Sequence, residues 1–217
     1  MSTANRSYRW LFWTLALCGL ALDQGSKYGL FAGLYSEGQY SGLITVVPGV
    51  FYLETTYSHL EDDGQGLLSA LRKANGPKLP SVNHGALWGI GNRAEEEPAG
   101  KDYNHVFAAV SVIAAIAIVL WSLRQSTAGD RWLCVALGLI LAGTLGNLYD
   151  RVIFLGVRDF FKWVYLYNFP VFNVADSCLV CGASLLLVQA FFASQEEKKV
   201  AAVARAASEE PVTADVK

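Results

Sequence analysis

Val106–Leu123 reads V-F-A-A-V-S-V-I-A-A-I-A-I-V-L-W-S-L, eighteen consecutive residues without a charged side chain. A helix rises about 1.5 Å per residue, so this stretch approaches the ~30 Å thickness of a bilayer core. It therefore predicts a membrane-spanning helix. The whole composition agrees, because 53% of the 217 residues are hydrophobic and 17% are charged, whereas a soluble domain carries about 25% charged residues.

Three further apolar blocks predict spans at about residues 9–34, 132–149 and 171–192, in addition to 106–123. Basic side chains lie before, between and after these blocks: Arg6, Arg9, Arg124, Arg131, Lys198 and Lys199. Because basic residues accumulate in cytoplasmic segments, we expect four transmembrane helices with both termini in the cytoplasm. The intervening segments, about 36–105 and 151–170, then lie on the outer side of the membrane.

The outer segment 36–105 has predicted structure of its own. Gly42–Leu53 is rich in Val, Ile, Tyr and Phe around a Pro-Gly step, which is typical of short strands. Gly66–Ala74 has leucines at helical spacing and predicts a short amphipathic helix. We expect an all-α polytopic membrane domain, residues 1–193, with a small β-rich extracytoplasmic subdomain. Residues 194–217 lack a large apolar face and predict a flexible cytoplasmic tail.

Neither the cysteines nor the histidines form a pattern typical of a metal or redox site. The cysteines all lie in apolar blocks, where a thiol behaves as a small hydrophobic group: Cys18, Cys134, Cys178 and Cys181. The C-x-x-C formed by the last two lacks a second Cys or His pair. The histidines share no ligand spacing: His59, His84 and His105. We expect no metal and no cofactor, and the net charge of −2 gives no sign of a nucleic-acid partner.

Polar side chains gather at one end of the predicted spans, although a charge at the centre of a span costs on the order of 2.5–3.5 kcal/mol. They lie at the outer ends of spans or in the outer connection: Asp23, Lys27, Asn147, Asp150, Arg151, Asp159, Asn173 and Asp176. The first two are four residues apart and can pair as a simple interfacial anchor. Asn173 can cap the last helix. Asp150 fits no cap, since a helix C-terminus disfavours a negative charge unless Arg151 or another cation offsets it.

Carboxylates gathered at a membrane face leave two functional readings open. In a chain without a Ser-His or Cys-His pattern, they favour acid–base chemistry. Acids inside spans also form proton relays, so a proton-coupled transporter is the alternative. Transporters usually show internal repeats and broken helices near the midplane, whereas these acids lie at one face and no repeat is evident.

Five short motifs around these side chains resemble those of the lipoprotein signal peptidases, also called signal peptidase II. They are Asp23-Gln24-Gly25-Ser26-Lys27, Asn83-His84-Gly85-Ala86-Leu87-Trp88, Gly146-Asn147-Leu148-Tyr149-Asp150-Arg151, Gly156-Val157-Arg158-Asp159-Phe160 and Phe172-Asn173-Val174-Ala175-Asp176-Ser177. They occur in the family's order over about residues 23–182. One such motif is weak evidence, but five in order on four predicted spans are specific.

The resemblance implies an aspartyl endopeptidase of the bacterial cytoplasmic (inner) membrane, with its active site near the outer face. Such enzymes remove signal peptides from diacylglyceryl-modified prolipoproteins by cleaving N-terminal to the lipidated Cys. Asp159 and Asp176 are the implied catalytic dyad, and their presence disfavours an inactive membrane scaffold. Supporting or substrate-binding roles are implied for Asp23, Lys27, Asn83, Gly85, Asn147, Asp150, Arg151 and Asn173. The implied partners are the lipidated substrates and membrane lipids, and we expect a monomer.

One segment departs from the family pattern. Between Phe51-Tyr52-Leu53 and Asn83 the family usually has only a handful of residues, whereas this chain has about thirty. The insertion, roughly residues 56–80, contains the predicted short helix and lies on the outer side. A lid over the site, a segment resting on lipid and a tolerated spacer without a role are all open interpretations.

Overall fold

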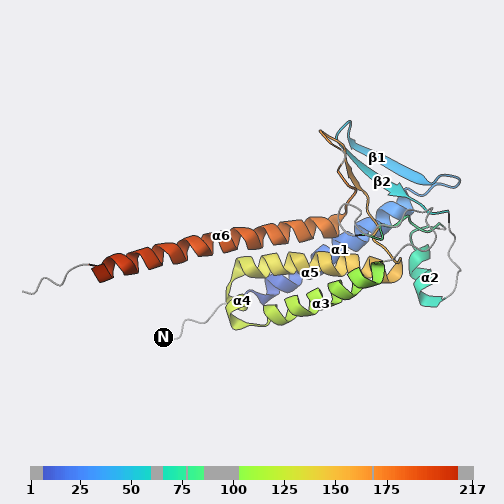
Figure 1. Cartoon of the computed structure of the whole chain (residues 1–217). Helices are drawn as coiled ribbons and strands as arrows, with labels where there is room; N and C mark the ends of the chain where they lie inside the picture. The colour runs from blue at the N-terminus through green and yellow to red at the C-terminus, as the bar shows by residue number, and fades with distance from the viewer. Residues whose placement is uncertain (1–6, 60–65, 77, 86–102, 168, 210–217) are drawn as a thin grey trace, which may run out of the picture.

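A computed structural model describes residues 7–59, 66–76, 78–85, 103–167 and 169–209 (Figure 1). The elements are, in chain order, α1 (Arg9–Gly33), β1 (Ser41–Val47), β2 (Phe51–Thr56), α2 (Gly66–Lys73), α3 (Asn104–Ser122), α4 (Gln125–Gly129), α5 (Arg131–Ile153), β3 (Phe161–Trp163) and α6 (Val174–Glu209). The four long predicted helices therefore form, as α1, α3, α5 and α6. The sheet and α2 lie together at one end of the helix bundle.

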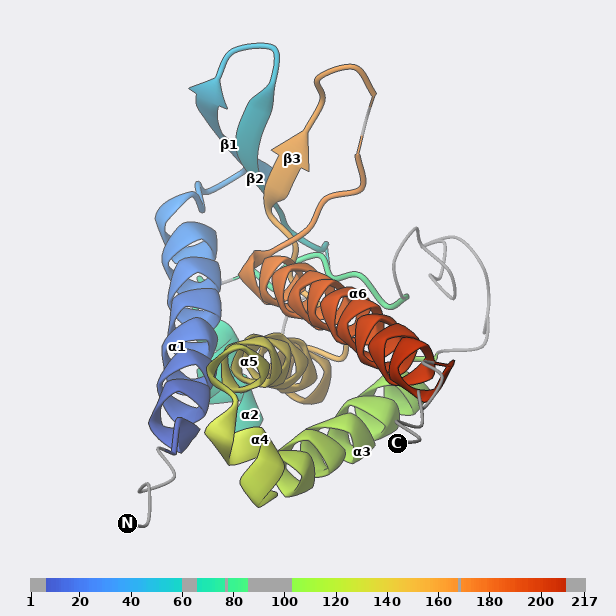
Figure 2. The same ribbon diagram turned by 90° about the vertical axis from the view of Figure 1, so that its left-hand side faces the viewer.

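Helix α5 is the centre of the bundle and packs against α1, α3 and α6 (Figure 2). Among the described residues, three helices are long and apolar enough to cross a membrane: α3, α5 and the Val174–Gln195 part of α6. Helix α1 has 25 residues and carries Asp23 and Lys27, and it is not among these three. The three apolar spans are thus confirmed as candidates, while the fourth span stays a prediction.

The helix bundle exposes large apolar side chains and buries charged ones. Large apolar side chains of the outer helices are exposed, for example Ile113 at 68% and Leu187 at 72%, whereas Asp23 and Lys27 are 0% exposed. A water-soluble protein buries its large apolar side chains and exposes its charged ones. This arrangement suits a bundle surrounded by hydrocarbon, where charged groups must find partners in the protein interior.

The three strands form one antiparallel sheet in the order β1-β2-β3. Strands β1 and β2 confirm the strands predicted within Gly42–Leu53, and Gly49 turns between them with φ +74°. Strand β3 was not predicted, because three residues carry too little periodicity to be recognised. It extends from the segment that holds Asp159, so the sheet fixes one side of that segment.

Part of the predicted tail is helical, because α6 continues to Glu209. The flexibility of residues 194–217 stays a prediction. The segment is rich in Ala, Glu and Lys, which have high helix propensity, so it can extend a helix without an apolar face. The predicted short helix at Gly66–Ala74 is confirmed as α2. Residues 60–65 and 77 of the insertion, Ala86-Leu87-Trp88 of the second motif and the chain beyond 209 lie outside the described residues.

Glycines allow α5 to approach two neighbouring helices. A Cβ placed on Gly146 would lie 2.5 Å from Asp23 Oδ2 and 3.0 Å from Ala175 Cβ. One on Gly143 would collide with the carbonyl oxygen of Ala175. The small residues thus bring the ends of α1, α5 and α6 together where the polar side chains lie.

We predict that Gly146→Ala lowers the free energy of unfolding by about 1–3 kcal/mol, because Asp23 is held in place and the new methyl group overpacks the contact. The measurement is thermal unfolding in detergent. Gly29→Ala is the control, since nothing lies within 4 Å of its Cβ position and alanine favours a helix. Equal midpoints for the two variants would contradict the close-packing interpretation.

Candidate active site

Two short backbone pairings position Asp159. On one side, Asn83 and Val157 exchange backbone hydrogen bonds of 2.8 and 2.9 Å. On the other, Phe161 and Phe172 exchange bonds of 2.7 and 3.1 Å. Because Phe172 directly precedes Asn173, the second pairing also brings the start of α6 beside Asp159. The segment that carries the acid is therefore tied to the loop before α3, to the sheet and to α6.

Asn173 donates hydrogen bonds to both acids of the predicted dyad. Its Nδ2 lies 2.7 Å from Asp159 Oδ1, and its backbone N–H donates to Asp176 Oδ2 at 3.2 Å. The backbone N–H of Asp176 donates in return to Asn173 Oδ1 at 2.9 Å. This reciprocal pair is a capping box at the start of α6, so the predicted cap is present. One residue thus caps a helix and joins two carboxyl groups.

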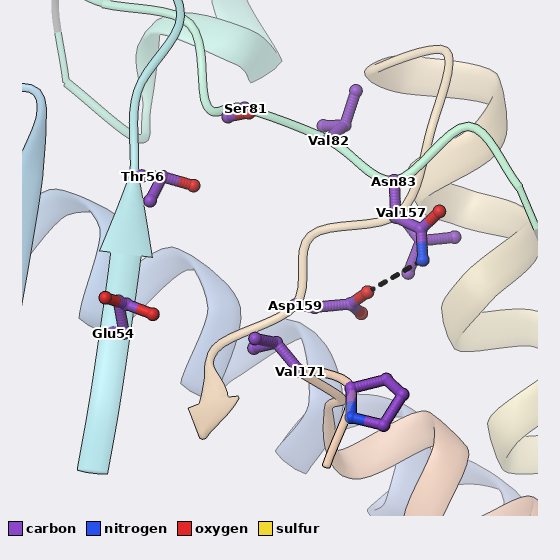
Figure 3. A pocket seen from close by; sticks show the side chains of 9 residues that line it. Glu54, Thr56, Ser81, Val82, Asn83, Val157, Asp159 and Val171 are labelled. Carbon is purple, nitrogen blue, oxygen red and sulfur yellow. Dashed lines mark hydrogen bonds between the residues drawn. The ribbon is translucent and has the colours of Figure 1, made fainter. Parts of the chain in front are cut away.

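Amides also bind the second oxygen of each acid. Asn83 Nδ2 donates to Asp159 Oδ2 at 3.2 Å (Figure 3), and Asn147 Nδ2 donates to Asp176 Oδ1 at 2.7 Å. These donors are neutral, so they orient the carboxyl groups without the strong stabilisation of the charged form that a cation gives. Within the described ranges, no three His, Cys, Asp or Glu side chains are grouped as metal ligands would be.

A pocket of about 320 Å³ opens beside Asp159 (Figure 3). It lies between strand β2, the segment around Asn83 and the residues just before α6. Its lining residues are Glu54, Thr56, Ser81, Val82, Asn83, Val157, Asp159, Pro170 and Val171. Asp159 therefore lines a pocket that also contains apolar and hydrogen-bonding groups.

The environment of Asp159 raises the pKa of its carboxyl from 3.8 to about 7. The main cause is desolvation, since protein atoms surround the group although one side remains open to the pocket. The negative charge of Asp176 adds to the shift, and the hydrogen bonds from Asn83 and Asn173 oppose it. A carboxylic acid that keeps its proton near neutral pH beside a second carboxyl is suited to general acid–base chemistry.

Four fully buried charges lie behind the two acids. Lys27 Nζ lies 2.9 Å from Asp23 Oδ2 and 3.1 Å from Asp150 Oδ2, and Arg158 Nη2 lies 2.7 Å from Asp150 Oδ1. Their formal charges sum to zero. The predicted pairing of Asp23 with Lys27 is confirmed. Of the two alternatives for offsetting Asp150, Arg151 or another cation, the structure shows the second, because Arg158 and Lys27 bind its carboxylate.

The sequence reasoning overlooked Arg158. A cation eight residues beyond Asp150 falls outside helical spacing, so periodicity does not connect them. The signal that remained was an arginine directly beside an acid of a motif, in a segment otherwise rich in apolar residues.

Arg151 has a different position. Its Nη1 donates to the carbonyl of Asn147 at 3.5 Å and its Nη2 to that of Gly85 at 3.4 Å. Gly85 in turn donates its N–H to Asn83 Oδ1 at 2.9 Å. The guanidinium also interacts electrostatically with Asp176 and with Asp159. Arg151 thus links the segment around Asn83 to α5 and supplies positive potential near the acids.

Asn147 joins the buried charges to the acids. Its Oδ1 accepts from Lys27 Nζ at 3.4 Å and from Asn173 Nδ2 at 3.2 Å, while its Nδ2 holds Asp176. Asp23 completes the connection, because its Oδ1 accepts from the backbone N–H of Ala175 at 2.8 Å. An anion at a helix N-terminus is favourable. All ten residues predicted for the site therefore lie in one connected set of hydrogen bonds and electrostatic contacts.

Comparison with known proteins assigns the chain to a family. The sequence model of a family described as signal peptidase (SPase) II matches residues 79–192. A lipoprotein signal peptidase of Rhodopirellula baltica is 36% identical over 194 residues, which cover 83% of this chain and 71% of that protein. The chain belongs to the signal peptidase II family. The family predicted from the motifs is thereby confirmed, and the chain is a membrane protease.

Further relatives agree. A lipoprotein signal peptidase of Pseudomonas syringae pv. tomato is 43% identical over 184 residues, covering 84% of this chain and 85% of that protein. A bacterial membrane enzyme solved by the in meso method at 2.3 Å resolution has the same fold, with a TM-score of 0.57 at 24% identity and coverage of 94% and 93%. A second bacterial membrane enzyme, solved by the in meso method at 1.9 Å resolution, has a TM-score of 0.56 at 26% identity. The match covers 81% of this chain and 89% of that chain.

We predict that Asp159→Asn changes how the stability of this signal peptidase depends on pH. The folded wild-type protein keeps the Asp159 proton up to about pH 7, whereas the unfolded chain releases it near 3.8, so rising pH between these values destabilises the wild type. The neutral amide removes this loss, worth on the order of 1–3 kcal/mol for a partly exposed group.

The thermal midpoint in detergent, measured from pH 4 to pH 8, should therefore shift in favour of the variant as pH rises. Glu37→Gln, at an exposed acid, is the control and should show a constant offset. A constant offset for Asp159→Asn would contradict the raised pKa.

Proposed function

We propose that this signal peptidase is an aspartic endopeptidase whose dyad is Asp159 and Asp176. The observation that carries the proposal is the sharing of Asn173, which donates one hydrogen bond to each carboxyl group. Two acids bound to one residue cannot both ionise easily, so they hold one proton between them at neutral pH. The negative charge of Asp176 contributes to the raised pKa of Asp159, so the proton that Asp159 keeps depends on the presence of both acids.

The reaction needs no covalent intermediate. The ionised carboxyl takes a proton from a water molecule, which attacks the scissile carbonyl, while the protonated carboxyl donates its proton to the carbonyl oxygen. The tetrahedral intermediate collapses when a proton passes to the leaving amine. The amides of Asn83 and Asn147 hold the two carboxyl groups in fixed orientations, and no cofactor takes part.

The proposed substrates are prolipoproteins that carry a diacylglyceryl group, cleaved on the N-terminal side of the lipidated Cys. The pocket beside Asp159 accepts the peptide near the scissile bond. The exposed apolar faces of the bundle, with Leu187 as an example, supply surfaces along which acyl chains can lie. In this proposal the enzyme acts as a monomer surrounded by membrane lipids.

We infer four spans, with both termini in the cytoplasm and the dyad near the outer face of the bacterial cytoplasmic membrane. Helix α1 supplies the fourth span. Its Asp23 and Lys27 face α5 and are fully buried, so they do not meet lipid when the helix crosses the bilayer. A transporter remains disfavoured, because the acids lie at one end of the bundle beside a pocket and the family is one of peptidases.

We predict that Asp159→Asn and Asp176→Asn each lower kcat for a lipidated prolipoprotein by at least about 10³-fold, a loss typical of removing a catalytic group. Each variant should still fold and show a cooperative thermal unfolding transition, because the amide has the same size as the acid. Turnover is measured with purified enzyme in detergent, and Glu37→Gln serves as the active control. Near wild-type turnover of either variant would exclude the dyad.

A second prediction concerns the substrate. A prolipoprotein with the diacylglyceryl group should be cleaved at least about 100-fold more efficiently, as kcat/KM, than the same chain without it, because burial of acyl chains contributes ~0.8 kcal/mol per CH₂. The two substrates are compared in the same micelles. Equal kcat/KM values would mean that the enzyme is a general membrane peptidase.

A further inference from the structure

The guanidinium of Arg158 needs several acceptors, because it is fully buried and always charged. Its Nη2 donates to Asp150 Oδ1 at 2.7 Å and to Gln24 Oε1 at 2.8 Å, and its Nε donates to Asp150 Oδ2 at 3.3 Å. The remaining nitrogen, Nη1, donates to Asn75 Oδ1 at 2.6 Å. The acceptors thus come from α1, from α5 and from the inserted segment.

The insertion holds Asn75 in place. Asn75 follows α2, is fully buried, and donates from Nδ2 to the carbonyl of Arg72 at 3.1 Å, so its Oδ1 is directed to Arg158. The Arg72 side chain donates from Nε to the carbonyl of Ile153 at 2.6 Å, at the end of α5. Gly76 then turns the chain with φ +115°, a conformation that favours glycine. The insertion is therefore docked on the bundle.

A neutral acceptor suits this position. Asp23, Lys27, Asp150 and Arg158 already sum to zero charge, so a further carboxylate would leave the buried cluster negative. The carbonyl of an asparagine satisfies the last guanidinium nitrogen without adding charge. A buried guanidinium N–H without an acceptor is costly, so the loss of Asn75 would favour movement of Arg158.

Movement of Arg158 reaches the catalytic acid directly, because the next residue is Asp159. The backbone N–H of Arg158 donates to Asp150 Oδ2 at 2.9 Å, and its carbonyl accepts from Asn173 Nδ2 at 3.4 Å. The same Nδ2 group binds Asp159 Oδ1. The orientation of Arg158 and the hydrogen bond that joins the two acids are therefore linked through one amide.

We propose that Asn75 is a positioning residue for peptide cleavage, through which the inserted segment holds Arg158 and thereby the Asp159 carboxyl against Asn173. The proposal rests on the proposed function, in which Asp159 is catalytic. The insertion is then more than a spacer, since Asn75, which does not line the pocket, supports the dyad from behind.

Two substitutions at Asn75 separate this role from simple support of the turn. Asn75→Leu loses both the acceptor for Arg158 and the donor to Arg72, whereas Asn75→Asp keeps the acceptor and loses the donor. We expect kcat to fall about 10- to 100-fold for Asn75→Leu, as small displacements of catalytic groups cause, with KM unchanged. The extra buried charge of Asn75→Asp should lower the thermal midpoint, but we expect its kcat to stay within about threefold of wild type, because positioning depends on the acceptor.

The pH profile gives a second readout. Loss of the Asn173 hydrogen bond raises the pKa of Asp159 further, so the alkaline limb of kcat should move to higher pH in Asn75→Leu. Ser69→Ala, at a buried α2 residue, is the control and should match wild type. If Asn75→Leu does not fold, Asn75→Ala is used for the same comparison.

The outcomes are distinct. Equal kcat losses for Asn75→Leu and Asn75→Asp would overturn the positioning role. A loss of thermal stability without a loss of kcat in Asn75→Leu would also overturn it. Wild-type kcat in Asn75→Leu would overturn it as well, provided that Asp159→Asn is inactive in the same assay. An active Asp159→Asn would instead reject the proposed function itself.

Discussion

The arrangement of the helices around the site depends on four fully buried charges: Asp23, Lys27, Asp150 and Arg158. Each would be expensive alone in a bilayer, and removal of one partner leaves the other uncompensated. Their mutual contacts therefore fix the relative positions of α1, α5 and the segment before β3. Since that segment carries Asp159 and Asp23 also binds the start of α6, the geometry of the site depends on this closed set.

Asp159 and Asp176 differ from the buried charges in the kind of partner that binds them. Charged groups behind them are paired with opposite charges, whereas Asp159 and Asp176 receive hydrogen bonds from the amides of Asn83, Asn147 and Asn173. A lysine in such a position would stabilise both carboxylates in their charged forms and oppose the proton sharing that we propose for them. Amides give orientation while leaving the pKa of Asp159 high, which is what acid–base chemistry at neutral pH requires.

Much of this arrangement could be predicted from local patterns, and the remainder depended on distant contacts. Hydrophobic blocks predicted the long helices, the spacing of Asp23 and Lys27 predicted their ion pair, and Asn173 was interpreted as a cap because it lies near the N-terminus of the last predicted span. Strand β3 escaped because three residues carry too little periodicity. Arg158 and Asn75 escaped because their partners lie eight and eighty-three residues away, and no periodicity encodes such a contact.

The closed set of buried charges also constrains how the sequence can change over evolution. A single substitution of Asp150 or Arg158 leaves an unpaired charge in the interior. Evolution must therefore change the two residues together or keep both. Asn75 adds a dependence of another kind, because its partner Arg158 lies within one of the five motifs of this chain whereas Asn75 belongs to the insertion. A homologue that has this arginine but lacks the inserted segment must supply the acceptor from another element or from water, so we expect covariation between the insertion and the surroundings of Arg158.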